Sequence, residues 1–512
     1  MKRLLGFITA LSMLAACAPA ENQLTEPTPT PPPQFSEPSG IYADWSRLAG
    51  PEIPEALGTR LSPGPLDSVT PSEEYGRLLP YIGDGIQDGW GWSEYRWGLV
   101  TDSGCVVLDP VLSSVLAITD GESCALVLTR AADGDGHSLQ ALCAADGSWC
   151  TDFLYSGIYP MQDGGIFLAD TRYDENGNFI GDIDNACIMD YEGNVVCNLS
   201  ELRPEADLGD WRNSAAFQYD FMSQSCGYAR VNLPDGRCVF MDINGKVLRS
   251  DEFDGYCASA APFNRGLACV MSSEGLWGLI DTNGKWVAQP QYRNLMDING
   301  AINAWTTDGR TLLLNDKGEE VLDVTHLTSP NITGLKNGVI ITDYTENGAV
   351  LYDGQLNALG TPADYFSVDG GVVVFRGLHE GEQGIVIYDG ENTIFHPGDY
   401  TTIIQENDRI AAVRADGVGE LLDMEGNVTA SLPDSENGVG CVMDAATGER
   451  YLIRWGSSAV SLCGENGKTM TNPGGLNGGI LWGYTARVDE TGAEIVTMDG
   501  ERIFRTSIDF TD

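Results

Sequence analysis

The chain has 512 residues, of which 62 are glycine, and 74 acidic side chains against 29 basic ones give a formal net charge of −45. The length exceeds one ordinary domain and favours a repeat array or a large all-β fold. The acidic balance argues against nucleic-acid or anionic-lipid binding by the folded part, because both partners require Lys and Arg. It is typical of a soluble, monomeric exported protein, and the 42% hydrophobic content argues against global disorder.

The N-terminus reads as an export signal followed by a tether. Lys2 and Arg3 precede a short apolar stretch that ends in Leu14-Ala-Ala-Cys17, which resembles a bacterial lipobox. The resemblance implies that residues 1–17 are the signal region and that Cys17 carries the lipid, such as palmitate, that anchors the protein to the membrane. A secretory signal cleaved at a small residue is the alternative. Residues 18–40 are rich in Pro and Thr and predict an extended spacer.

Twelve cysteines remain after Cys17, and an exported chain lies in a compartment that permits disulfides. Cys143 and Cys150 flank one predicted hairpin turn, and Cys187 and Cys197 flank another. We therefore expect some disulfides and name these two pairs as candidates. Buried free thiols are the alternative, and no CxxC spacing indicates a zinc site.

From residue 95 one pattern recurs: an apolar strand, an acidic or Asn turn with Gly, and a second apolar strand. Asn-Gly and Asp-Gly suit two-residue hairpin turns, in which both central residues have positive φ. The spacing of 34 to 52 residues predicts a solenoid, propeller or array. The turn glycines that define this spacing are Gly104, Gly147, Gly193, Gly245, Gly284, Gly318, Gly354, Gly390, Gly426 and Gly467.

Two of these units align closely. Trp97-Gly-Leu-Val and Trp277-Gly-Leu-Ile each lead into a turn, and Pro110 and Pro290 end the two runs. On these residues the sequence resembles the bacterial WG-repeat family, which implies a β-repeat protein and no particular reaction. Separately, the turn that starts at Asp444 and continues Ala-Ala-Thr-Gly is similar to that of quinoprotein-like propeller blades.

The predicted fold is all-β, built from short antiparallel hairpins and sheets in a propeller-like repeat over residues 95–512. Two smaller propellers or an open β superhelix are the alternatives, because stacked sheets bury faces that a single sheet leaves open. Residues 41–94 are predicted to be an irregular lead-in segment.

Two candidate sites stand out from the repeats. Oxygen ligands alternate in one acidic loop, at a spacing that suits Ca²⁺, and the alternative is a solvated turn: Asp174, Asn176, Asn178 and Asp182. A cluster of aromatic rings is a candidate for contact with a glycan or other ligand, and the alternative is packing between units: Trp90, Trp92, Tyr95 and Trp97.

No catalytic motif is found: there is no HExxH, GxSxG or P-loop. We therefore expect no enzyme and no cofactor beyond a possible Ca²⁺. The predicted function is an extracytoplasmic lipoprotein of the bacterial envelope that serves as a binding module for a protein or a glycan. A propeller-type carbohydrate-active hydrolase and a structural envelope component are the alternatives.

Overall fold

The computed structural model describes a chain whose regular elements are all β-strands. The described residues are 59–60, 77–87, 93–102, 106–130, 138–161, 164–169, 186–209, 211, 221, 224–361, 366–379, 381–406, 408–455, 459–473, 477–489, 492–507 and 510–511. The prediction of an all-β repeat protein is confirmed.

The strands fall into two compact units, which we call the middle unit and the terminal unit. The described part of the middle unit is Met161 together with Glu201–Val428, and that of the terminal unit lies within Thr25–Pro160, Gly164–Ser200 and Thr429–Asp512. The terminal unit therefore combines strands from the first and the last parts of the described sequence.

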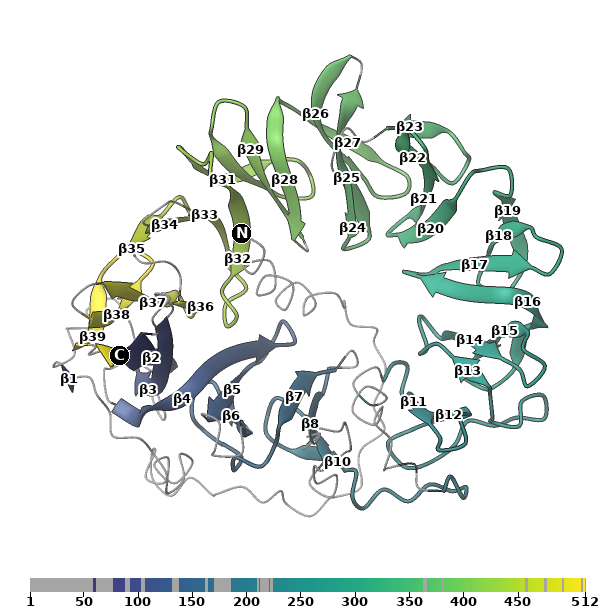
Figure 1. Cartoon of the computed structure of the whole chain (residues 1–512), viewed down its shortest axis with the longest axis horizontal. Helices are drawn as coiled ribbons and strands as arrows, with labels where there is room; N and C mark the ends of the chain where they lie inside the picture. The colour runs from purple at the N-terminus through teal and green to yellow at the C-terminus, as the bar shows by residue number, and fades with distance from the viewer. Residues whose placement is uncertain are drawn as a thin grey trace. The chain divides into compact units, whose positions relative to one another are not determined.

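The middle unit consists of consecutive antiparallel sheets (Figure 1). Its strands are β11 (Ala229–Asn232), β12 (Cys238–Met241), β13 (Ser259–Ala260), β14 (Leu267–Met271), β15 (Trp277–Asp281), β16 (Trp286–Ile298), β17 (Ala301–Thr306), β18 (Thr311–Leu314), β19 (Glu320–Asp323), β20 (Pro330–Leu335), β21 (Gly338–Thr345), β22 (Gly348–Tyr352), β23 (Ala358–Gly360), β24 (Phe366–Asp369), β25 (Val372–His379), β26 (Glu382–Tyr388), β27 (Thr393–Pro397), β28 (Tyr400–Glu406), β29 (Arg409–Arg414) and β30 (Gly419–Leu422). The next strand, β31 (Val428–Leu432), begins at the last residue of this unit and continues into the terminal unit.

The terminal unit contains the first and the last strands of the sequence. They are β1 (Thr59–Arg60), β2 (Leu78–Gln87), β3 (Ser93–Thr101), β4 (Val106–Thr119), β5 (Cys124–Arg130), β6 (Gln140–Ala144), β7 (Gly157–Pro160), β8 (Ile166–Ala169), β9 (Cys187–Met189), β10 (Val195–Asn198), β32 (Val439–Met443), β33 (Arg450–Trp455), β34 (Ala459–Gly464), β35 (Thr469–Pro473), β36 (Asn477–Leu481), β37 (Tyr484–Asp489), β38 (Gly492–Thr497), β39 (Arg502–Ser507) and β40 (Phe510–Thr511).

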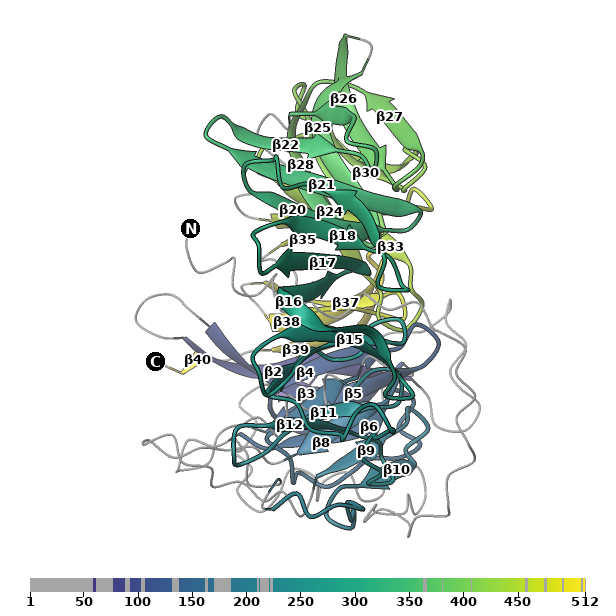
Figure 2. The same cartoon turned by 90° about the vertical axis from the view of Figure 1, so that its right-hand side faces the viewer.

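Most sheets are four-stranded meanders in sequence order, such as β20–β23, β24–β27 and β28–β31. This is the strand pattern of a propeller blade. Figure 2 shows the sheets of the middle unit as successive layers. One apolar core joins β24–β27 to β28–β31, with Val374, Ile385, Tyr400 and Ile410 all buried in it. The repeat is propeller-like because each sheet covers the face of the next one.

Two long strands, β4 and β16, each pair with strands of two successive meanders. The first part of β16 pairs with β15 and its second part pairs with β17, and Tyr292 lies at the change of partner. In the same way β4 pairs first with β3 and then with β5, and Leu112 lies at the change. Because one strand continues through both meanders, the two repeats that best match the WG pattern sit in larger sheets than the other repeats.

The first and the last described strands come together inside the terminal unit. Strand β40 runs parallel to β2, and β1 pairs with β39. Leu79 and Tyr81 of β2 pack in one core with Ile495 and Phe504 of β38 and β39. Strand β2 lies inside residues 41–94, so the prediction of an irregular lead-in is wrong for Leu78–Gln87. Gly83 and Gly85 interrupt its alternation of apolar residues, which hid the strand in the sequence.

Two kinds of hairpin turn replace the single kind that the sequence suggested. Asn299-Gly300 and Gly370-Gly371 have positive φ at both central residues, as predicted, and they join the first two strands of a meander. In the Asp-x-x-Gly turns between the last two strands only the glycine is left-handed, for example Gly245 at φ 83°. These are the longer loops in which a left-handed glycine follows a tight turn, so the prediction of two-residue turns is wrong for them.

Candidate functional site

The Asp-x-x-Gly turns are held by the Asp side chain. Oδ1 of Asp281 accepts hydrogen bonds from the backbone N–H groups of Asn283 (2.8 Å) and Lys285 (2.9 Å). Oδ1 of Asp423 accepts from Glu425 (3.0 Å) and Asn427 (2.8 Å) in the same way. A short carboxylate that bonds to the backbone two and four residues later explains why Asp recurs at the start of these turns.

The turn glycine also packs against the preceding meander. A Cβ on Gly318 would lie 2.8 Å from the carbonyl oxygen of Val287, and one on Gly426 would lie 3.1 Å from the Ile394 side chain. The glycine carbonyls accept hydrogen bonds across the same contact, from Ser250 Oγ to Gly284 (2.6 Å) and between His396 Nδ1 and Gly426 (2.9 Å). At Gly318 and Gly426 two properties of glycine are therefore needed: it adopts a positive φ, and it leaves room for the close contact.

The middle unit carries a series of such turns, each between the last two strands of a meander. We call this the acidic turn row, and its members are the turns that begin at Asp242, Asp281, Asn315, Asp353, Asp389 and Asp423. Exposed carboxylates within the row include those of Asp316, Glu319, Glu391 and Glu425.

Three of the carboxylates that hold these turns, those of Asp281, Asp353 and Asp389, have lowered pKa values. For Asp389, burial alone would raise the pKa, but hydrogen bonds from Asn392, Glu391 and Asn337 outweigh it and lower the pKa to about 2. Hydrogen bonds also lower the pKa of Asp281 and Asp353 against the effect of burial. The row therefore presents fixed negative charge over the whole physiological pH range.

A buried polar cluster lies where β27 meets β28–β30, and we call it the Glu420 cluster. The hydroxyl of Tyr400 donates to Oε2 of Glu420 at 2.7 Å. Nη1 of Arg414 lies 3.4 Å from Oε1, and Nε2 of His396 lies 3.9 Å from Oε2. Burial and the bond to Glu420 raise the pKa of Tyr400.

The Glu420 cluster holds groups suited to acid–base chemistry, but access to them is restricted. Tyr400 is 1% exposed and Glu420 is 7% exposed. A substrate reaches this pair only if the two sheets separate, whereas His396 and Arg414 form the accessible side. The arrangement connects the two sheets, because His396 of β27 also bonds to the turn glycine Gly426.

Glu494 is a second buried acid, and three arginines surround it. Glu494 on β38 is 2% exposed and binds Arg487 of β37 and both Arg502 and Arg505 of β39. Burial alone would raise the pKa of Glu494, but the arginines outweigh it and the pKa is lowered. Three guanidinium groups on one buried carboxylate satisfy its oxygens and connect three neighbouring strands.

The Asp444 turn connects two meanders of the terminal unit. Asp444 is fully buried, and its Oδ1 accepts hydrogen bonds from the backbone N–H of Ala446 (2.9 Å) and of Trp482 (2.9 Å). Trp482 and Gly483 form the first hairpin turn of the next meander, β36–β37, with positive φ at both residues. The carboxylate therefore links β32 to the β36–β37 hairpin through hydrogen bonds.

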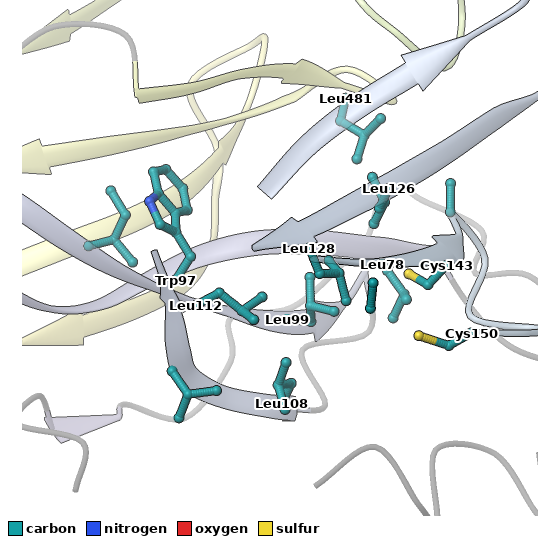
Figure 3. Packing of buried hydrophobic residues seen from close by; sticks show 14 of the residues in the cluster. Leu78, Trp97, Leu99, Leu108, Leu112, Leu126, Leu128, Cys143, Cys150 and Leu481 are labelled. Carbon is teal, nitrogen blue, oxygen red and sulfur yellow. The ribbon is translucent and has the colours of Figure 1, made fainter. Parts of the chain in front are cut away.

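Part of the predicted aromatic cluster lies in the core. Trp97 is 9% exposed and packs with leucines of β3–β5, where Figure 3 shows its ring beside Leu112 and Leu99. Tyr95 packs against the same core and is half-buried. Trp90 and Trp92 lie outside the described residues. The described members thus have the packing role that was the alternative to ligand contact.

The remaining predicted site residues are the lipidation candidate and the four candidate calcium ligands. Cys17 and the proposed calcium ligands Asp174, Asn176, Asn178 and Asp182 lie outside the described residues. Within the described part of the chain, no group of three or more His, Cys, Asp or Glu is placed to hold a metal ion. No helix among these residues is long and apolar enough to cross a membrane.

No disulfide joins the described cysteines in the structure, so neither predicted pair is closed. Cys143 and Cys150 do face each other across a β-bridge. Cys187 and Cys197 do not, because Cys197 pairs with Ile188 and successive residues of a strand point to opposite faces. A register shift beside Cys197 separates the two, and turn spacing alone does not reveal it.

A small pocket lies in the terminal unit. This pocket, between β2 and β36–β38, is lined by Leu79, Tyr484, Ile495 and their neighbours, and its volume of about 10 Å³ holds at most one water molecule. The residues that the sequence did not single out are Glu420 and Glu494. Their only signal was an acid in the middle of a strand, where an apolar residue is expected.

The WG unit is recognised independently. Residues 277–301 match the family model described as WG containing repeat. This match begins at Trp277, covers β15 and β16 and ends at the β16–β17 turn, which supports the resemblance to WG-repeat proteins in this part of the chain.

Whole-chain comparisons give distant likenesses. AztD from Citrobacter koseri is 8% identical with a TM-score of 0.25, over 85% of this chain and 99% of that one. BamB from Moraxella catarrhalis is 14% identical with a TM-score of 0.21, over 48% and 78%. A eukaryotic initiation factor is 10% identical with a TM-score of 0.36, over 70% and 96%. The chain has no match among curated proteins.

Proposed function

We propose that this protein is a β-repeat binding module, anchored by a lipid on Cys17 to the outer side of a bacterial membrane, whose loops contact a partner protein or glycan. The observation that carries the proposal is the acidic turn row. A series of turns is fixed by Asp carboxylates and docked on the neighbouring sheets, so the loops keep their conformation before a partner arrives. Preorganised loops lose less conformational entropy on binding.

The charge of the row favours a partner that presents basic groups. The exposed acids Glu391 and Glu425 lie in turns whose backbone is fixed, and the pKa of Asp389 is lowered to about 2. Complementary charge raises the rate of association and makes it dependent on salt. Solubility is the other use of such a surface, and it predicts no saturable binding.

The anchor is tested separately from the binding. The full chain should fractionate with membranes, and Cys17→Ser should release it into the soluble exported fraction. Mass spectrometry of the mature N-terminal peptide should show acyl chains on Cys17. A Cys17→Ser chain that stays with the membrane, or an unmodified Cys17, would overturn the lipid anchor.

Binding is tested with the exported Cys17→Ser chain on a sensor surface, against arrays of glycans and of cationic and neutral peptides. We expect saturable binding that weakens at least tenfold in Glu391→Lys/Glu425→Lys. The matched control reverses two exposed charges outside the row, Glu122→Lys/Glu436→Lys, and should bind as the wild type does. An equal loss of binding in both variants would show that net charge, and not the acidic turn row, explains the binding. Hydrolysis of an arrayed glycan would favour the hydrolase instead.

A further inference from the structure

Two pairs of buried thiols lie opposite each other on neighbouring strands. Cys238 of β12 and Cys257 form a β-bridge, and their sulfur atoms are 3.2 Å apart. Cys143 of β6 and Cys150 form a second bridge, and both point into the core of Figure 3. We propose that these are two intrachain disulfide sites, Cys238–Cys257 and Cys143–Cys150, that an oxidising compartment closes.

The backbone spacing suits a disulfide at both positions. Cys238 and Cys257 exchange two backbone hydrogen bonds, of 2.9 and 3.1 Å, which places their Cα atoms about 5.5 Å apart. Cys143 and Cys150 lie between hydrogen bonds made by their neighbours, Ala144 with Trp149 and Thr151 with Leu142. Such a pair has its Cα atoms about 4.5 Å apart. Disulfides span Cα distances of about 4.4 to 6.8 Å, so both pairs close with little backbone movement.

Six other described cysteines lie opposite other residues or on opposite faces of their sheets. Cys441 and Cys463 both pair with Leu452, from opposite sides of β33. Two strand spacings separate them, about 9.6 Å, which is too far for a bridge. Cys187 and Cys197 point to opposite faces of their sheet. Cys269 pairs with Leu279, and Cys226 accepts a hydrogen bond from the backbone N–H of Gly266.

The chemistry requires an oxidant, which we take to be a disulfide such as oxidised glutathione. The thiolate of one cysteine attacks a sulfur of the oxidant, the S–S bond breaks, and one thiolate leaves. The second cysteine attacks the mixed disulfide, forms the intrachain bond and releases the second thiolate. The two protons of the protein thiols end on the two released thiols, so that one disulfide is reduced as the other forms.

Burial determines when this happens. Cys238 and Cys257 are each 3% exposed, among Phe240, Phe253 and Phe263. The contact with Cys238 and burial raise the pKa of Cys257, which slows attack in the folded state. Both pairs therefore close while the chain folds. This inference does not depend on the binding role, although export supplies the oxidising compartment.

The test is refolding of the full Cys17→Ser chain in a glutathione redox buffer, followed by alkylation with N-ethylmaleimide and tryptic mass spectrometry. Cys238 lies in peptide 238–246 and Cys257 in peptide 250–265, so their disulfide links two tryptic peptides. Cys143 and Cys150 share one peptide, which should be 2 Da lighter and unalkylated at both positions. Alkylated Cys238 and Cys257 after refolding in this buffer would overturn the assignment of that pair.

Stability provides a second readout. A phosphine reductant should lower the melting temperature of the oxidised wild type and leave Cys143→Ala/Cys150→Ala/Cys238→Ala/Cys257→Ala unaffected. The control Cys187→Ala/Cys197→Ala should keep the wild-type response to the reductant. If that control also lost the response, the disulfides would lie elsewhere and the pairing would be wrong, whatever the outcome of the binding experiments.

Discussion

The units around Trp97 and Trp277 have the same register in different surroundings. Trp97 pairs with Leu112 and Leu99 with Leu108, while Trp277 pairs with Tyr292 and Leu279 with Ala288. Trp97 is buried in a core of leucines, whereas Trp277 is only half-buried beside the core that contains Tyr292. The shared pattern therefore specifies the path of the strands, and the burial of the tryptophan depends on the neighbouring sheet.

The largest expected difference between the units comes from the tryptophans themselves. Trp97→Ala removes a ring that is 9% exposed and should lower the free energy of unfolding by about 3–5 kcal/mol. Trp277→Ala removes a half-buried ring and should cost less than half as much. Urea denaturation followed by circular dichroism measures both. Equal losses would show that the surroundings do not set the role of this residue.

The glycines after the tryptophans should be equally important in both units. A Cβ on Gly98 would lie 2.5 Å from the Leu108 carbonyl oxygen, and one on Gly278 would lie 2.8 Å from that of Ala288. Neither backbone oxygen is free to move away, so each Gly→Ala change should cost about 1–3 kcal/mol in urea denaturation.

Gly354→Ala is the matched control for these two changes. Its Cβ would meet only a methyl group of Val339, at 3.3 Å, and its φ is not in the left-handed region. We expect a change within about 0.5 kcal/mol. Lower chain entropy in the unfolded state would, if anything, stabilise this variant. A loss as large as that of Gly278→Ala would therefore show that the close approach to a backbone oxygen does not explain the cost at the WG glycine.

The sequence predicted these local features well because they depend on neighbours in the chain. Of the predicted turn glycines, Gly245, Gly284, Gly318 and Gly426 all have the positive φ that their turns require. Gly354 does not, because its turn places Leu356 at φ 65° instead. That turn still begins with a capping Asp353, and the Gly318 turn begins with Asn315, whose side-chain oxygen caps it in the same way. A short side chain with an oxygen acceptor therefore begins both turns, including the one in which the glycine does not have positive φ.

Features that depend on distant residues were not predictable. Glu420 meets Tyr400 across β28–β30 and His396 from the preceding sheet, and no spacing in the sequence indicates that contact. Likewise the bridge between Cys238 and Cys257 requires the chain to return after 19 residues, whereas the nearer spacing of Cys187 and Cys197 suggested a pair that the strand register forbids.

The capping carboxylate of the second unit gives a smaller effect. Asp281→Ala removes the acceptor of two backbone hydrogen bonds, and it should cost about 1 kcal/mol. The equivalent position of the first unit is Thr101, so the two units differ here. Asp251→Ala, at an exposed position outside any Asp-x-x-Gly turn, is the control and should change the urea midpoint little. A similar loss for Asp251→Ala would attribute the effect to surface charge.

The smallest expected effect is a pH dependence at Asp389, which caps its turn as Asp281 caps that of the second WG unit. Its folded pKa of about 2 lies below the unfolded value of about 3.9, so its stabilisation is complete above pH 5 and is lost as the pH falls towards 2. At pH 6, Asp389→Asn should have a lower urea midpoint than the wild type, and at pH 2 the two midpoints should converge. Asn337 donates to Asp389 at 2.8 Å, so Asn337→Ala should narrow the gap at pH 6. A gap that persists at pH 2 would mean that the shape of the side chain, and not its charge, holds the turn.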